Sequence, residues 1–316
     1  MAATVPVVRR PEPTVDYRAT STQRTVGPLI AVVGMMVVGV AFIAGLVAAQ
    51  RVGTDTFARI NAWAFGTTTL GLAIAKTGIA VVLIGIVVRL WMRVDSVKWS
   101  LGRLKPKSPA ATSVERGDIT TPFGKARATE TAPKRRVIDR AARVLWFPML
   151  AMGAMAVAGG FVLSLFWAGD AADRPGTAVD FAAWTQGLQF LGEAFLLGGI
   201  SFLLGAILAS LREGGGEVQE SLGVTVKTLK MPLSAKLFIG LMAMGMMVAM
   251  AQFVLYIVAT TVSGESSIQA WFAWLGPTRE IGLGLLLSGI VLALYTIGTV
   301  LGFQFDRIKS IVRTGL

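Results

Sequence analysis

Residues 62–90 read AWAFGTTTLGLAIAKTGIAVVLIGIVVRL, and the same ungapped pattern returns at 183–211 and 273–301. Each copy opens with Ala-Trp, places a Gly eight residues after the Trp, and continues through Gly-Ile to a final Ile and Leu. Upstream of each copy lies a second shared segment, Gly-x-Met followed by a Phe. A fixed spacing that occurs three times indicates an internal repeat, here a pair of segments in each unit.

The composition places these segments in a membrane. Hydrophobic residues make up 54% of the chain and the mean hydropathy is +0.66, more than soluble globular chains show. A helix needs about 20 apolar residues to cross the hydrocarbon core. No segment alternates with the period of two that a barrel strand requires. The sequence predicts six membrane-spanning helices, at about 29–49, 68–91, 144–167, 187–211, 236–261 and 281–303.

The basic residues predict the orientation of these helices. Of the 30 Lys and Arg residues, 25 lie before the first helix, in the second and fourth connections, or after the last helix. The positive-inside rule then puts both termini in the cytoplasm. We therefore expect an all-α integral membrane protein of a bacterial inner membrane. Its six helices would form three repeated hairpins around a pseudo-threefold axis.

The segments between the hairpins are polar. The loop 98–143 carries twelve basic and four acidic residues, a net charge of +8. We interpret it as a flexible segment that contacts anionic lipid head groups or an acidic partner, or as an ordinary positively charged loop. The total charge of +12 does not predict nucleic-acid binding, because no recognition motif accompanies it. The predicted units are a polar tail 1–28, hairpin 29–97, the basic loop 98–143, hairpin 144–222, a linker 223–235 and hairpin 236–316 with an amphipathic end.

Glycine spacing predicts how the helices of each hairpin pack. Membrane helices associate through close backbone contact along stripes of small residues, and a period of seven favours left-handed crossings. Gly71, Gly78 and Gly85 of the second helix recur every seven residues, and the small residues Gly27, Gly34, Ala41 and Ala48 of the first helix do the same. The predicted packing glycines are Gly71, Gly78, Gly85, Gly192, Gly199, Gly282 and Gly289.

Two charged residues lie well inside the predicted spans, away from their ends: Lys76 and Glu193. Intramembrane charges are costly and mark functional candidates. Their positions in the repeat differ by about one helical turn, so they can meet if their helices are neighbours. The pair would serve as a proton or cation relay, or as a structural ion pair; Lys76 alone would extend toward the interface.

Other recurring residues have two interpretations each. Met36, Met155 and Met247 either fill the core or face a common axis, where three thioethers can hold Cu(I). Trp63, Trp184 and Trp274 either anchor the helices at the outer interface or form a docking surface. We interpret Gly214-Gly215-Gly216 as a helix break.

The apolar periodicity of the even-numbered helices continues past the predicted membrane boundary. Spacings of three and four put these residues on one helical face. Such a face lies on the bilayer surface or binds a partner. The residues are Val94, Val97 and Leu101, and the matching Phe305, Ile308 and Val312.

The chain has little catalytic chemistry. It contains no His and no Cys, which excludes thiolate metal sites and removes the commonest general base. We therefore expect no enzyme activity and no cofactor. The leading hypothesis is a non-catalytic subunit that scaffolds or stabilises a larger assembly of other integral membrane subunits. The alternatives are a channel or permease for a small neutral solute, and a Met-based copper-handling protein.

Overall fold

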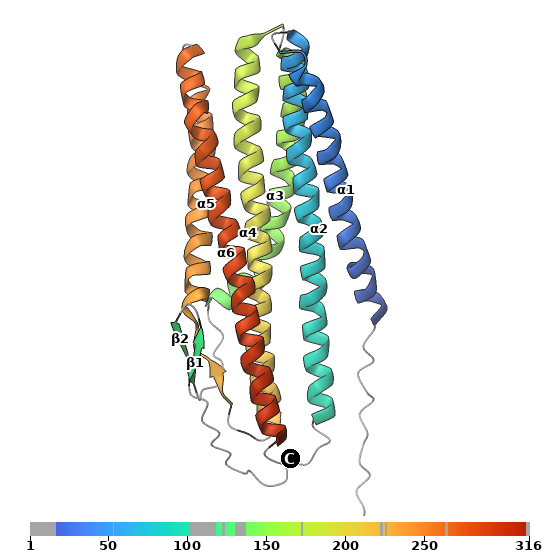
Figure 1. Ribbon diagram of the computed structural model, residues 1–316, viewed down its shortest axis with the longest axis vertical. Coiled ribbons are helices and arrows are strands. Elements are labelled where there is room, and N and C mark those ends of the chain that lie inside the picture. Colours follow the sequence, from blue (N-terminus) through green and yellow to red (C-terminus); the bar gives the residue numbers. More distant parts are fainter. Residues whose placement is uncertain are drawn as a thin grey trace, which may run out of the picture.

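The computed structural model describes residues 17–52, 54–101, 118–121, 124–129, 137–171, 173–221, 224, 226–262 and 265–313. Six helices dominate it (Figure 1), and each is long and apolar enough to cross a membrane, which confirms the predicted all-helical membrane fold. The helices are α1 (Tyr17–Ala49), α2 (Asp55–Leu101), α3 (Val137–Asp170), α4 (Pro175–Ser221), α5 (Leu233–Ala259) and α6 (Glu265–Arg313).

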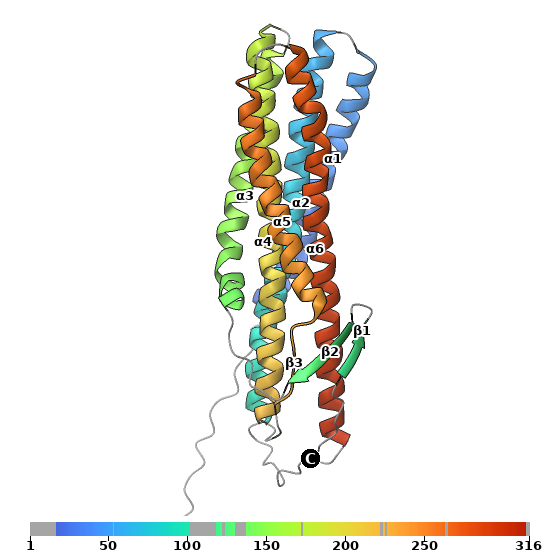
Figure 2. The same ribbon diagram turned by 90° about the vertical axis from the view of Figure 1, so that its left-hand side faces the viewer.

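The helices form three antiparallel hairpins, α1–α2, α3–α4 and α5–α6, each closed by a short turn at the same end of the molecule. Helices α2, α4 and α6 have 47, 47 and 49 residues, whereas α1, α3 and α5 have 33, 34 and 27. At about 1.5 Å per residue the longer helices reach roughly 70 Å, over twice the hydrocarbon thickness of about 30 Å. Their last turns, up to Leu101, Ser221 and Arg313, extend beyond the shorter helices at the end that holds both described termini (Figures 1 and 2). We call these last turns the stalk.

The repeated glycines bring the two helices of a hairpin together. A Cβ on Gly71 would lie 2.8 Å from the Gly34 carbonyl oxygen, and one on Gly192 would lie 2.9 Å from that of Gly153. In the third hairpin a Cβ on Gly245 would lie 3.2 Å from the Gly282 carbonyl oxygen. The same pair of repeat positions is therefore in contact in all three hairpins, as close backbone packing in lipid requires.

Helix α4 is the centre of the molecule. It contacts α2, α3, α5 and α6. Of the residues in its most apolar 18-residue stretch, 78% are buried, whereas 11–33% are buried in the corresponding stretches of the other helices. Large apolar side chains fill this centre, among them Phe190, Leu196, Leu203 and Leu204, which are fully buried.

The helix contacts differ from the predicted pseudo-threefold packing. Among the described residues, the hairpin α3–α4 packs against both others, whereas α2 and α6 have no comparable helix contact. They meet through side chains, with the Arg279 guanidinium 5.6 Å from the centre of the Phe65 ring. The asymmetry centres on α4, which is enclosed by α2, α3, α5 and α6.

Three predictions about the polar segments need correction. Tyr17–Ala49 is one helix, so the predicted tail 1–28 is helical from Tyr17 onward. Within the loop 98–143, β1 (Asp118–Thr121) and β2 (Gly124–Thr129) pair antiparallel, and β2 also pairs with β3 (Thr228–Leu229). Helix α4 continues through Gly214-Gly215-Gly216 without a break. A side chain on Gly215 would collide with Gln304 of α6, so this glycine permits close packing in the stalk.

Candidate functional site

The structure brings three intramembrane charges together. Lys76 Nζ lies 3.1 Å from Glu193 Oε1, and Arg279 Nη2 donates a hydrogen bond of 3.3 Å to Glu193 Oε2. The side chain of Glu193 is 1% exposed, that of Lys76 18% and that of Arg279 15%. We call this cluster the ion triad. It takes one residue from each hairpin, through α2, α4 and α6.

The two contacts of Glu193 differ in kind. Arg279 donates a directed hydrogen bond, whereas Lys76 lies at ion-pair distance from Oε1 without hydrogen-bond alignment, so that this oxygen has no hydrogen-bond partner. An arginine guanidinium stays protonated in proteins. The Glu193 carboxylate therefore has one counter-charge held by a directed hydrogen bond and a second counter-charge at ion-pair distance on the flexible Lys76 side chain.

Sequence reasoning missed Arg279, because we assigned it to the turn before a sixth helix that starts at 281. The helix instead begins at Glu265 and buries most of the Arg279 side chain. The repeat contains a signal for this position. Arg279 lies three residues before Gly282, as Gln189 does before Gly192, and Gln189 is fully buried. Aligning the repeats would have placed Arg279 on an inner face.

A row of polar side chains continues from the triad along α4. Thr185, Gln189 and Glu193 are spaced by four residues and are all buried. Within the described part of the chain, the Thr185 hydroxyl and both polar atoms of Gln189 have no hydrogen-bond partner. The hydroxyl of Thr67, a buried residue of α2, has none either. Buried polar atoms are normally paired, so this row is a place where ordered water would be bound.

The chemistry of the triad is that of fixed charges. A relay needs a continuous path of groups that pass on a proton or cation, whereas Glu193 lies between two cations, with Arg279 hydrogen-bonded to Oε2 and Lys76 at ion-pair distance from Oε1. Beyond the triad toward the stalk, the centre of the molecule is filled by Leu196, Leu203 and Leu204. The geometry therefore favours the structural interpretation of the Lys76–Glu193 pair over a proton or cation relay.

The structure separates the three repeated methionines. Met36, Met155 and Met247 are 65%, 67% and 62% exposed, on α1, α3 and α5. These three helices pack on the longer helices and not around a common axis. The geometry of a single copy of this chain therefore gives no support to the predicted alternative of a thioether site for Cu(I). The described residues also include no group of His, Cys, Asp or Glu that could hold a metal.

The remaining predicted residues occupy the two ends of the bundle. Trp184 and Trp274 are 38% and 44% exposed. Trp184 packs edge-on against Phe253 with 6.2 Å between ring centres, and Trp63 is partly buried. In the stalk, Phe305 is 68% exposed and Ile308 partly buried. The side chains of Val94, Val97, Leu101 and Val312 lie outside the described residues.

Comparisons with protein-family models, with curated proteins and with solved structures found no match for this chain.

Proposed function

We propose that this chain is a non-catalytic membrane subunit that scaffolds or stabilises a larger complex of integral membrane subunits. The observation that carries the proposal is the ion triad, which joins one residue from each hairpin. These charges hold the three hairpins in one arrangement. Such a rigid body suits a scaffold better than a channel, whose gate has to move.

The filled centre of the bundle also favours a scaffold over a channel. Transporters build their binding sites from broken helices and polar residues at the midplane. Here α4 is continuous from Pro175 to Ser221, and large apolar side chains occupy its surroundings. A path for a small neutral solute would have to displace them.

The stalk is the surface proposed for a partner. Phe305 exposes most of its ring near the C-terminal end of α6, the helix whose last turns extend beyond the shorter helices (Figure 2). Exposed aromatic side chains are typical anchors of protein interfaces. Following the distribution of basic residues, we propose that this end faces the cytoplasm of a bacterial inner membrane. There the basic segment 98–143 would contact anionic lipid head groups.

The test is extraction of the full chain from its native membrane in a mild detergent, followed by native mass spectrometry. We expect stoichiometric larger subunits to travel with it. Phe305→Ser should release them, whereas Phe42→Ser should retain them, because Phe42 is similarly exposed (65%) but lies on α1, away from the stalk. A lone monomer or homo-oligomer, with wild-type extraction otherwise intact, would overturn the proposal.

A further inference from the structure

A cavity of about 260 Å³ lies between α3 and α5, with α4 as its floor. Both α3 and α5 pack against α4 but not comparably against each other, which leaves a lateral opening between them. We call this space the α3–α5 groove. Its lining includes Ala142 on α3, Gly198 and Gly205 on α4, and Ala243 and Met246 on α5.

Small residues create the groove and make it apolar. Gly198, Gly205 and Ala142 present little or no side chain where larger residues would close the space. Ser201 is the one hydroxyl in the lining, and it donates a 2.8 Å hydrogen bond to the carbonyl of Leu197 in its own helix. The groove therefore offers hydrocarbon contacts and no polar group that needs a ligand.

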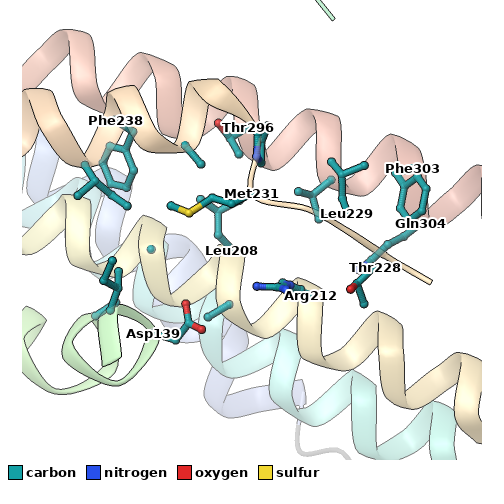
Figure 3. Close-up of a pocket in the computed structure, with 18 residues that line it drawn as sticks. Asp139, Leu208, Arg212, Thr228, Leu229, Met231, Phe238, Thr296, Phe303 and Gln304 are labelled. Carbon is teal, nitrogen blue, oxygen red and sulfur yellow. The ribbon is translucent and has the colours of Figure 1, made fainter. Parts of the chain in front are cut away.

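Toward the stalk the groove runs into a second space of about 100 Å³, mostly apolar but with several polar side chains in its wall, which shares Ile138, Ala142, Gly205, Phe238 and Ile239 with it. Figure 3 shows polar side chains from four segments around this space. Thr296 is among them, and its hydroxyl lies 2.8 Å from that of Ser234. The labelled polar residues are Asp139, Arg212, Thr228, Thr296 and Gln304.

We call this second space the mouth of the groove, and the segments that line it carry a net positive charge. Arg212 and Asp139 line it, and the exposed Arg140, Lys230 and Lys236 directly adjoin lining residues in sequence. Arg143, Glu213 and Lys227 also adjoin lining residues in sequence, and Arg143 forms an ion pair with Glu213. The segments that line this space therefore carry six cations and two anions in or next to its wall. Basic pockets between membrane helices bind the head groups of anionic lipids.

We infer that the α3–α5 groove holds one acyl chain of an anionic phospholipid, with the phosphate of that lipid at the basic mouth. The groove is apolar and opens to the lipid, which suits an acyl chain. The mouth is positively charged, which suits the phosphate of the same lipid. The size of the space favours a chain over a partner helix. A helix is about 10 Å across, whereas this cavity is smaller than the roughly 300–1,000 Å³ of ordinary ligand pockets. This inference stands independently of the scaffold proposal.

The test measures binding of phosphatidylglycerol to the purified, delipidated full chain by native mass spectrometry. Phosphatidylcholine with the same acyl chains is the comparison. We expect one tightly retained phosphatidylglycerol and at least tenfold weaker retention of phosphatidylcholine. Equal retention of the two lipids would overturn the role of the basic mouth. Full competition by glycerophosphoglycerol, which lacks acyl chains, would overturn the role of the groove.

Matched variants locate the site. Ala243→Leu fills the groove from its exposed edge, and Ala251→Leu places the same side chain on an exposed position of α5 that lines neither space. We expect the first to weaken retention at least tenfold and the second to leave it unchanged. Lys230→Gln with Lys236→Gln, both on exposed residues, should remove the preference for the anionic lipid without affecting folding. Retention unchanged in both Ala243→Leu and the Lys double variant would overturn the inference, as would a protein helix bound in the groove.

Discussion

The ion triad makes a quantitative prediction for Glu193→Gln. This substitution keeps the size of the side chain but leaves Lys76 and Arg279 facing each other without an anion, 18% and 15% exposed. Removing one partner of a buried ion pair costs about 3–5 kcal/mol. We expect the free energy of unfolding to fall by an amount in this range. The two remaining cations repel each other, and their partial exposure relieves some of that repulsion.

Single removal of a cation should cost less. Lys76→Met leaves Glu193 hydrogen-bonded to Arg279, and the cluster becomes neutral. The loss is then that of a charge-assisted contact, about 1.5–3 kcal/mol at most. The neutral triple variant Lys76→Met/Glu193→Leu/Arg279→Met removes every charge and should be nearly as stable as the wild type, since apolar replacements of buried ion clusters are often neutral or stabilising.

The assay is thermal unfolding of each purified variant in the same detergent. About 2 °C per kcal/mol is the lower end of the range for larger domains. By that scale, Glu193→Gln should lower Tm by about 6–10 °C and Lys76→Met by clearly less. A Tm for Glu193→Gln within 2 °C of wild type, or a larger loss for Lys76→Met than for Glu193→Gln, would refute the reasoning.

Three further predictions concern packing and metal binding. Gly78→Ala should lower the free energy of unfolding by about 1–3 kcal/mol, because its Cβ would lie 2.6 Å from the Gly27 carbonyl oxygen. The control is Gly39→Ala, whose Cβ would lie in open space on α1. Equal Tm values for the two variants would contradict the packing. Gln219→Leu should speed trypsin cleavage at Lys227 and Lys230, because the Gln219 amide accepts a 2.8 Å bond from the Lys227 N–H and donates to the Lys227 carbonyl; an unchanged cleavage rate would show that this side chain does not hold the linker. The purified monomer should bind no Ag(I) by mass spectrometry, since its three repeated Met side chains point outward; stoichiometric Ag(I) lost in Met155→Leu would restore the thioether site.

The six spans could be predicted from the sequence because hydrocarbon imposes one requirement, a run of apolar residues of sufficient length. The glycines facing each other within a hairpin follow similarly from the repeat. The stalk was partly predictable, because the apolar spacing of three and four residues continues past the predicted membrane boundary in the first and third repeats. Its continuation through Gly214-Gly215-Gly216 of α4 was not, because glycine is a weak helix former and this triplet is typical of a helix break. The pairing of β2 with β3 joins residues about 100 positions apart, and short strands carry little local signal of a distant partner.

The triad shows why the candidate site was only partly predictable. Lys76 and Glu193 stand out because each interrupts an apolar run, whereas Arg279 follows Pro277 and precedes Glu280 in a polar stretch. Its burial depends on α2 and α4, through Phe65 and Glu193. That is a tertiary property, and the hydropathy of α6 alone does not contain it.

The positions of the three charges within the repeat explain what the triad adds to apolar packing. Relative to the glycine eight residues after the repeated Trp, Arg279 lies at −3, Glu193 at +1 and Lys76 at +5. Successive steps of four residues correspond to about 6 Å along each helix. Three similar hairpins can pack on one another in several orders and depths through glycine and apolar faces alone. One anion placed between two cations at staggered depths matches a single order, so the charges discriminate among arrangements that the repeat leaves nearly equivalent. We therefore expect the neutral triple variant to keep its Tm but to pack its hairpins in more than one arrangement. It should migrate as more than one species on a native gel.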